Sequence, residues 1–86
     1  SKKWGRLRIQ RELKARGLTD YNIEAGLSEI TDDDYADTLD LLAEKKQTTI
    51  KEKNPYKAKA KLANFLLYRG FEPELVYEIV DELYDE

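Results

Sequence analysis

The chain of 86 residues lacks cysteine, histidine and methionine altogether. Without cysteine there is no disulfide framework and no thiolate metal site, which is typical of a reducing cytosol, so we expect a cytoplasmic protein. Without histidine the commonest general base and metal ligand is missing. The absence of methionine indicates that the chain does not begin at its own start codon, so we expect a piece of a longer protein.

Long apolar runs are missing as well. No stretch approaches the roughly 18 apolar residues of a membrane span, and no signal-peptide core is present. The glycines stand singly, which excludes a glycine-rich phosphate loop. The carboxylates lie on polar faces, with nothing to bury them and shift their pKa values. We therefore expect no enzymatic activity, no metal, no cofactor, no small-molecule substrate and no membrane partner.

What the chain does contain is a repeat. Residues 4–30 align without a gap with residues 57–83, at a fixed offset of 53 residues. An Arg-Gly-apolar motif at 16–18 recurs at 69–71, and the apolar spacing that follows is the same in both copies. A fixed-period repeat indicates one supersecondary unit used more than once, and such units usually build binding surfaces rather than catalytic clefts.

Local signals predict an all-α fold. The repeated glycine suits the left-handed residue just past a helix, while Thr19, Thr31 and Asn54 are expected N-caps and Pro73 suits a first helical turn. The predicted helices span 2–16, 20–30, 32–47, 55–69 and 73–84. They form tandem three-helix repeats, residues 1–53 and 54–86, of which the second lacks its third helix.

The net charge of −3 conceals blocks of opposite sign. The net charge is +6 over residues 1–16, −9 over 17–44, +7 over 45–71 and −7 over 72–86. One interpretation is that basic and acidic helices pair with each other, although exposed pairs contribute only about 0–1 kcal/mol each. Consecutive helical residues point about 100° apart, so the acidic run at 32–34 is better explained by helix capping than by a metal ion.

The first helix of each repeat carries one stripe of polar and aromatic side chains. Positions separated by four, seven and eleven residues lie on one helical face. The candidate partner-binding residues on these stripes are Trp4, Arg8, Arg11, Lys57, Lys61, Asn64 and Tyr68. Guanidinium groups form forked bonds to carboxylates and phosphates, and the rings offer stacking area. The alternative is a solvated face, with Trp4 covering the edge of the core.

The repeat is similar to a known one. The pattern KLxxFLxxRGF at 61–71, followed by VxxIV at 76–80, resembles the last repeat of the RecX family of bacterial regulatory proteins. The pattern WGxxxIxxELxxRGL at 4–18, followed by IxxGL at 23–27, resembles the repeat before it. The resemblance covers nearly the whole chain and implies the middle and last repeats of such a protein.

This resemblance implies a function in homologous recombination, DNA repair and the SOS response. RecX proteins bind the RecA recombinase filament on single-stranded DNA, and they inhibit its ATP hydrolysis and strand exchange. The implied partners are therefore the RecA filament and the single-stranded DNA within it. Two alternatives stay open from the residues themselves: a small helical nucleic-acid-binding module, and a scaffold for some other protein.

Overall fold

The computed structural model describes residues 3–85, and these form five helices and no strand. The helices are α1 (Arg6–Ala15), α2 (Asp20–Leu27), α3 (Asp32–Gln47), α4 (Pro55–Tyr68) and α5 (Pro73–Tyr84). The predicted all-α class is confirmed. The largest difference is at α1, which begins four residues later than predicted, because Gly5 is its extended N-cap; the predicted first residue, at position 2, lies outside the described part.

Three helices carry the predicted N-caps. The Oγ1 atoms of Thr19 and Thr31 each accept a hydrogen bond from the backbone N–H three residues on, at 3.2 and 3.1 Å. Asn54 Oδ1 accepts hydrogen bonds from the backbone N–H groups of Tyr56 and Lys57, in the first turn of α4. The acidic run at 32–34 then fills the first turn of α3, where negative charge meets the positive end of the helix dipole.

The two helices that carry the repeated stripes end in the same way. Gly17 after α1 and Gly70 after α4 adopt φ values of +91° and +93°. In each case the N–H of the next residue bonds to the carbonyl five residues before it, at 3.1 Å after α1 and 3.3 Å after α4. This is the Schellman arrangement, and it requires the left-handed conformation that glycine adopts at little cost.

The main core lies among α3, α4 and α5. Its buried residues are Tyr35, Leu39, Ala43, Leu62, Ala63, Leu66, Phe71, Val76, Ile79 and Val80. By contrast, α1 buries no residue and α2 buries Ile23. Because α4 packs against both α3 and α5, its apolar side chains are needed on two sides.

The position of α3 differs from the predicted grouping. The sequence pattern assigns this helix to the first repeat, at residues 1–53, whereas the structure packs it on α4 and α5. The reason is the larger apolar surface of the second copy. Phe71 is fully buried there, while its counterpart Leu18 is 39% exposed. The three helices that share a core are thus α3, α4 and α5, and α1 and α2 form a separate pair.

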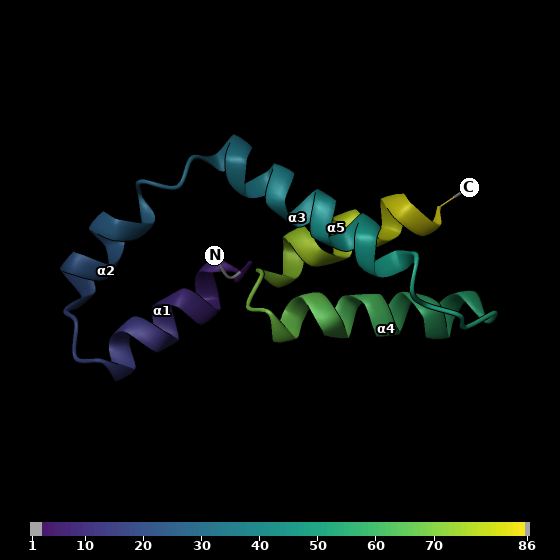
Figure 1. The fold of residues 1–86 in the computed structure, drawn as a ribbon, viewed down its shortest axis with the longest axis horizontal. Coiled ribbons are helices and arrows are strands. Elements are labelled where there is room, and N and C mark those ends of the chain that lie inside the picture. Colours follow the sequence, from purple (N-terminus) through teal and green to yellow (C-terminus); the bar gives the residue numbers. More distant parts are fainter. Residues whose placement is uncertain (1–2, 86) are drawn as a thin grey trace.

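Figure 1 shows the resulting arrangement. The molecule is elongated, with extents of 44 × 24 × 22 Å. The three-helix bundle occupies one end and the α1–α2 pair the other, and α1 starts near the end of α4 and runs obliquely away from it. Both helices that carry the predicted stripes lie along the same side of the molecule.

Candidate interaction surface

Helices α4 and α1 meet end to end, with the end of α4 against the start of α1. The backbone N–H of Gly5 donates to the carbonyl of Arg69 at 2.8 Å, and that of Leu7 donates to the carbonyl of Gly70 at 3.0 Å. The carbonyl groups of the two residues that follow α4 therefore accept hydrogen bonds from amide groups at the start of α1, which has no side-chain cap. The positive end of the α1 dipole also faces the negative end of the α4 dipole.

Arg8 is the residue on which the two predicted stripes meet. Its guanidinium carbon lies 4.3 Å from the ring centre of Trp4 and 5.6 Å from that of Tyr68. Trp4 precedes α1 and does not occupy its first turn, which is the turn the stripe requires. Its ring nevertheless contacts Arg8, so both rings flank one cation in the geometry of cation–π interactions.

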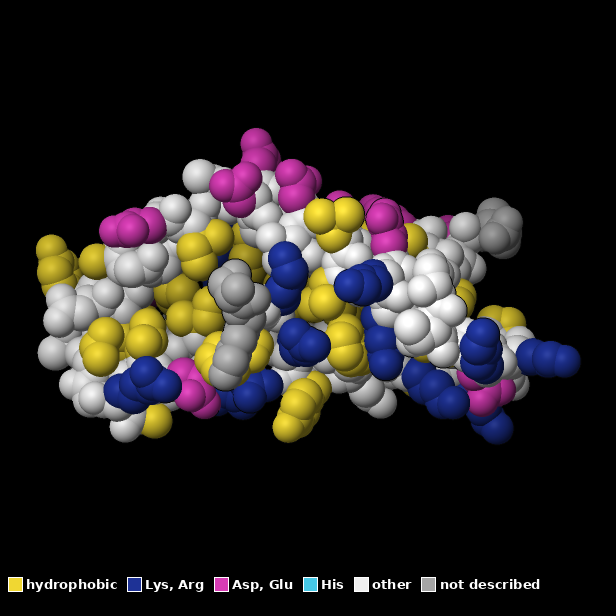
Figure 2. All heavy atoms as spheres, viewed as in Figure 1, with side chains coloured by type: hydrophobic (Ala, Val, Ile, Leu, Met, Phe, Trp, Pro, Cys, Tyr) yellow, Lys and Arg dark blue, Asp and Glu magenta, His cyan; other side chains and the backbone are white. Residues whose placement is uncertain are grey.

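The remaining stripe residues are exposed. Lys57, Lys61 and Asn64 follow the outer side of α4 toward Tyr68, and Arg11 lies one turn beyond Arg8 on α1. We call the whole set the basic ridge: Trp4, Arg8, Arg11, Lys57, Lys61, Asn64 and Tyr68. Figure 2 shows most basic side chains over the α1–α4 side, whereas acidic side chains gather on the opposite side over α3.

A shallow basic groove lies beside the ridge, between the end of α3, the segment at 48–54 and α4. Its volume is about 820 Å³. Lys46 and Lys51 line it together with the ridge residues Lys61, Asn64 and Tyr68. Sequence reasoning missed the first two. The lysine-rich run at 45–53 is their signal, but helical periodicity alone does not show that this segment folds back beside α4.

A second cluster centres on Arg6, at the joint between the two halves. Its guanidinium lies 2.9 Å from Asp32 and 3.5 Å from Glu72, and it stacks 3.9 Å above the ring of Tyr35. The Tyr35 hydroxyl accepts a hydrogen bond from the backbone N–H of Arg6 at 2.8 Å and donates one to Glu72 at 2.6 Å. These contacts tie the start of α1 to α3 and to the residue before α5.

The same cluster shifts the pKa values of two groups. Burial, together with the hydrogen bond to Glu72, raises the pKa of Tyr35 well above its usual value. Partial burial acts to lower the pKa of Arg6, but the hydrogen bond to Asp32 and the nearby Glu72 carboxylate outweigh it, so that pKa is also raised. Both shifts favour the neutral phenol and the charged guanidinium, which are the forms that a structural joint needs.

Pairing between the charge blocks is sparse in the described residues. The ion pairs are Arg6–Asp32, Arg6–Glu72, Lys14–Asp20, Lys59–Asp81 and Lys61–Glu52. Most acidic side chains of α3 and α5 are exposed and belong to none of these pairs. Mutual pairing therefore accounts for only a small part of the charge, and both the basic and the acidic surfaces stay available to other molecules.

The described part of the chain contains neither a cluster of metal-binding side chains nor a membrane-spanning helix. Between residues 3 and 85, no three Asp or Glu side chains are grouped so that they could hold a metal ion. Asp32, from the acidic run, faces Arg6 instead. Within the same range, none of the helices combines the length and the apolar character needed to cross a membrane.

The described part of the chain is thus an all-helical repeat with cations and aromatic rings along one side. Comparison with known proteins then gives the family. Residues 32–80 match the model of the third three-helix domain of RecX, and residues 1–27 match that of the second. The chain belongs to the RecX family. The match to the third domain begins at the first residue of α3, in agreement with the packing of this helix on α4 and α5.

One curated relative is the regulatory protein RecX of Leuconostoc mesenteroides. It is 31% identical over 78 residues, which cover 91% of this chain and 29% of the relative. The chain thus spans less than a third of the length of the relative that it matches. No solved structure matches this chain.

Proposed function

We propose that this chain is part of a non-enzymatic, cytoplasmic regulator that binds the RecA recombinase filament and inhibits its recombination and ATPase activity. Two findings support the proposal: membership of the RecX family, and a relative that is named a regulatory protein. The observation that carries it is the continuity of the basic ridge across the joint between α4 and α1, where Arg8 contacts rings from both halves.

The ridge suits a long, repetitive partner. It follows one side of a molecule that is 44 Å long, so different parts of it reach successive subunits of a filament. Its cations fit acidic side chains, and they also fit the phosphates of single-stranded DNA held in the filament. A ligand shifts a filament only as far as it prefers one filament state. Inhibition then follows from tighter binding to the inactive state of the filament, or from occlusion of the filament surface.

Charge reversal tests the ridge directly. We expect the double variant Arg8→Glu, Lys61→Glu to lose most of its binding to RecA filaments on single-stranded DNA in low salt, because it replaces attraction with repulsion at two points. Fluorescence anisotropy of the labelled chain measures this binding. Since Arg8 is half-buried, the variant Arg11→Glu, Lys61→Glu repeats the test at two exposed positions.

The matched control is Lys45→Glu, Lys53→Glu, which makes the same change in net charge at exposed positions off the ridge. It should keep most of the binding, and circular dichroism should show unchanged helix content in every variant. Equal binding by the reversed and unaltered chains would remove the ridge from the contact. Equal loss in the control would mean that net charge alone governs the association.

The basic groove favours a second candidate function, direct binding of single-stranded nucleic acid. Lysines lie there beside an exposed Tyr68, a combination that suits phosphates and stacked bases. This candidate predicts binding to bare single-stranded DNA, with an affinity that falls steeply as salt rises. A titration that follows Trp4 fluorescence, with bare DNA in one arm and RecA-coated DNA in the other, separates the two functions.

A further inference from the structure

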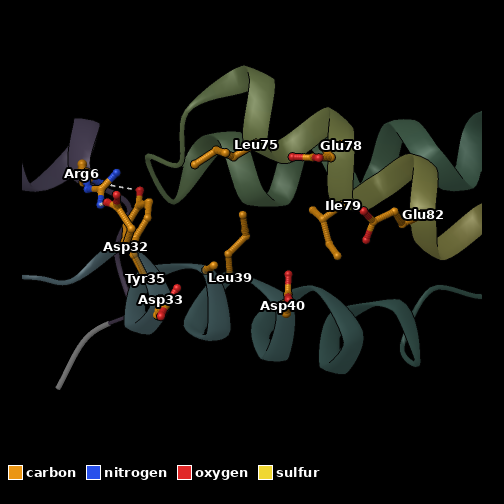
Figure 3. Close-up of a pocket in the computed structure, with 11 residues that line it drawn as sticks. Arg6, Asp32, Asp33, Tyr35, Leu39, Asp40, Leu75, Glu78, Ile79 and Glu82 are labelled. Carbon is orange, nitrogen blue, oxygen red and sulfur yellow. Dashed lines mark hydrogen bonds and ion pairs between the residues drawn. The ribbon is translucent and has the colours of Figure 1, made fainter.

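A second groove lies on the other side of the molecule from the basic ridge, between α3 and α5. Its volume is about 560 Å³. Figure 3 shows Leu39 and Ile79 pointing into the space between the two helices, with Leu75 above it. Leu39 and Ile79 are almost fully buried, while Leu75 is partly buried and keeps some contact with solvent. The floor of this groove is therefore apolar and partly open to solvent.

The rim of the groove is acidic. Asp33 and Asp40 contribute from α3, and Glu78 and Glu82 from α5. None of these four carboxylates forms an ion pair with a residue in the described part of the chain. The one basic residue of the lining, Arg6, lies at one end and is already held by two other carboxylates. The groove thus combines an apolar floor with uncompensated negative charge along both edges.

We propose that this groove binds a basic amphipathic helix of a protein partner. Apolar side chains of that helix would pack on Leu39, Leu75 and Ile79, while its lysines and arginines would pair with the acidic rim. The elements suit this occupant: the apolar and the acidic lining positions of α5 each recur after four residues, so they form two parallel rows along the groove. A helix with an apolar stripe flanked by cations matches such a pair of rows. The groove does not overlap the basic ridge, so this inference goes beyond the proposed function.

Charge decides against other occupants. The rim repels the phosphates of nucleic acids and of anionic lipid headgroups, because it places like charges together. A partner with positive charge on both flanks of an apolar stripe is attracted along both acidic edges of the groove. The chain has a basic face of its own in the ridge, so a second copy is the competing occupant, and the experiment must separate it from a different protein.

The test uses a designed helical peptide with leucine on one face and lysine on the other, and a second peptide in which glutamate replaces every lysine. We expect the lysine peptide to bind the 86-residue chain and the glutamate peptide to show no binding. Fluorescence anisotropy of the labelled peptides gives both affinities. Equal binding of the two peptides would overturn the proposal, because apolar contact alone would then explain it.

Two sets of charge-neutralising substitutions locate the site. The groove variant is Asp40→Asn, Glu78→Gln, Glu82→Gln. The control variant is Asp37→Asn, Glu44→Gln, Glu74→Gln, which removes the same charge from exposed positions of the same two helices outside the lining. We expect affinity for the lysine peptide to fall about tenfold in the groove variant and much less in the control. An equal fall in both would overturn the proposal.

An uncharged change tests the floor. Ala36 lies in the lining and is exposed, so Ala36→Gln places a longer side chain in the groove without affecting the core or the net charge. It should weaken peptide binding, and unchanged binding would contradict docking in the groove.

A second copy of the chain is the remaining competing occupant, and analytical sedimentation measures its association. Self-association of the unaltered chain that the groove variant abolishes would identify a second copy as the occupant and overturn the proposal. Peptide binding that survives Arg8→Glu, Lys61→Glu separates this result from any failure of the proposed filament contact.

Discussion

Gly5 and Gly70 lie where the end of α4 meets the start of α1, and neither residue has room for a side chain. A Cβ atom at Gly5 would overlap the backbone of Gly70 and Phe71, and one at Gly70 would overlap Arg8. The contact joins the end of α4 to the start of α1, which are far apart in the chain. It also places the two halves of the basic ridge next to each other, with Arg8 beside the ring of Tyr68, so a local steric requirement determines the shape of the candidate interaction surface.

The first prediction concerns this contact. Gly5→Ala should lower the free energy of unfolding by about 1–3 kcal/mol, because the new methyl group forces the two helix ends apart and leaves amide groups of α1 uncapped. Gly26→Ala is the matched control. It lies within α2 with no atom within 4 Å of an added Cβ, so it should raise the same quantity by about 0.5–1 kcal/mol. Urea unfolding followed by circular dichroism measures both changes.

The opposite signs make this pair of variants informative. If Gly5→Ala stabilised the chain as Gly26→Ala is expected to do, α4 would not cap α1 in solution. The two halves of the ridge would then have no fixed relation to each other. The proposed filament contact would lose its structural basis, even with every cation still present.

The second prediction concerns Tyr35. Tyr35→Phe should lower the free energy of unfolding by about 1–3 kcal/mol near neutral pH, because it leaves the backbone N–H of Arg6 and the carboxylate of Glu72 without their shared partner. Tyr21→Phe, at a position that is 82% exposed, is the control and should change stability by less than about 0.5 kcal/mol.

The raised pKa of Tyr35 also predicts that the free energy of unfolding depends on pH in the alkaline range. The pKa of Tyr35 is raised in the folded state, with burial as the first cause, so the phenol ionises more readily in the unfolded chain, near pH 10. Its contribution is therefore fully present below about pH 10 and is lost progressively as the pH rises beyond that value. Unfolding curves above and below pH 10 should show the difference between the unaltered chain and Tyr35→Phe shrinking. A constant difference would contradict the prediction.

Features set by neighbouring residues could be predicted from the sequence. The caps at Thr19, Thr31 and Asn54 and the left-handed Gly17 depend on a few consecutive residues, and so do most helix boundaries. Physical preferences at that range are strong enough to decide the local backbone. The all-α fold and the resemblance to RecX repeats rest on these local patterns.

Features set by contacts between distant segments could not be predicted. The acidic first turn and apolar spacing of α3 do not show which helices it packs on, because that depends on the larger apolar surface of α4 and α5. The start of α1 depends on carbonyl groups at Arg69 and Gly70. The stripe pattern identified Arg8 and Tyr68 separately, but only the end-to-end stacking of the helices brings them together.

The third prediction separates capping from metal binding in the acidic run of α3. Thr31→Ala should lower the free energy of unfolding by about 1 kcal/mol, because the Oγ1 atom accepts a hydrogen bond from the N–H of Asp34 at 3.1 Å. Adding magnesium or calcium should leave the melting temperature unchanged, with or without the substitution. A melting temperature that rose with metal and fell again with a chelator would show that the carboxylates bind an ion.

The fourth prediction uses Trp4, the only tryptophan of the chain, to report on the ridge. The Arg8 guanidinium lies 4.3 Å from its ring centre, so Arg8→Ala should open the ring to solvent and increase quenching of its fluorescence by acrylamide. The loss of stability should be small, about 0.5–1 kcal/mol. Arg11→Ala removes an exposed arginine one turn away and should leave the quenching unchanged. Equal quenching in both variants and the unaltered chain would mean that Arg8 does not cover the ring in solution, and Trp4 and Tyr68 would then have to be treated as two separate surfaces.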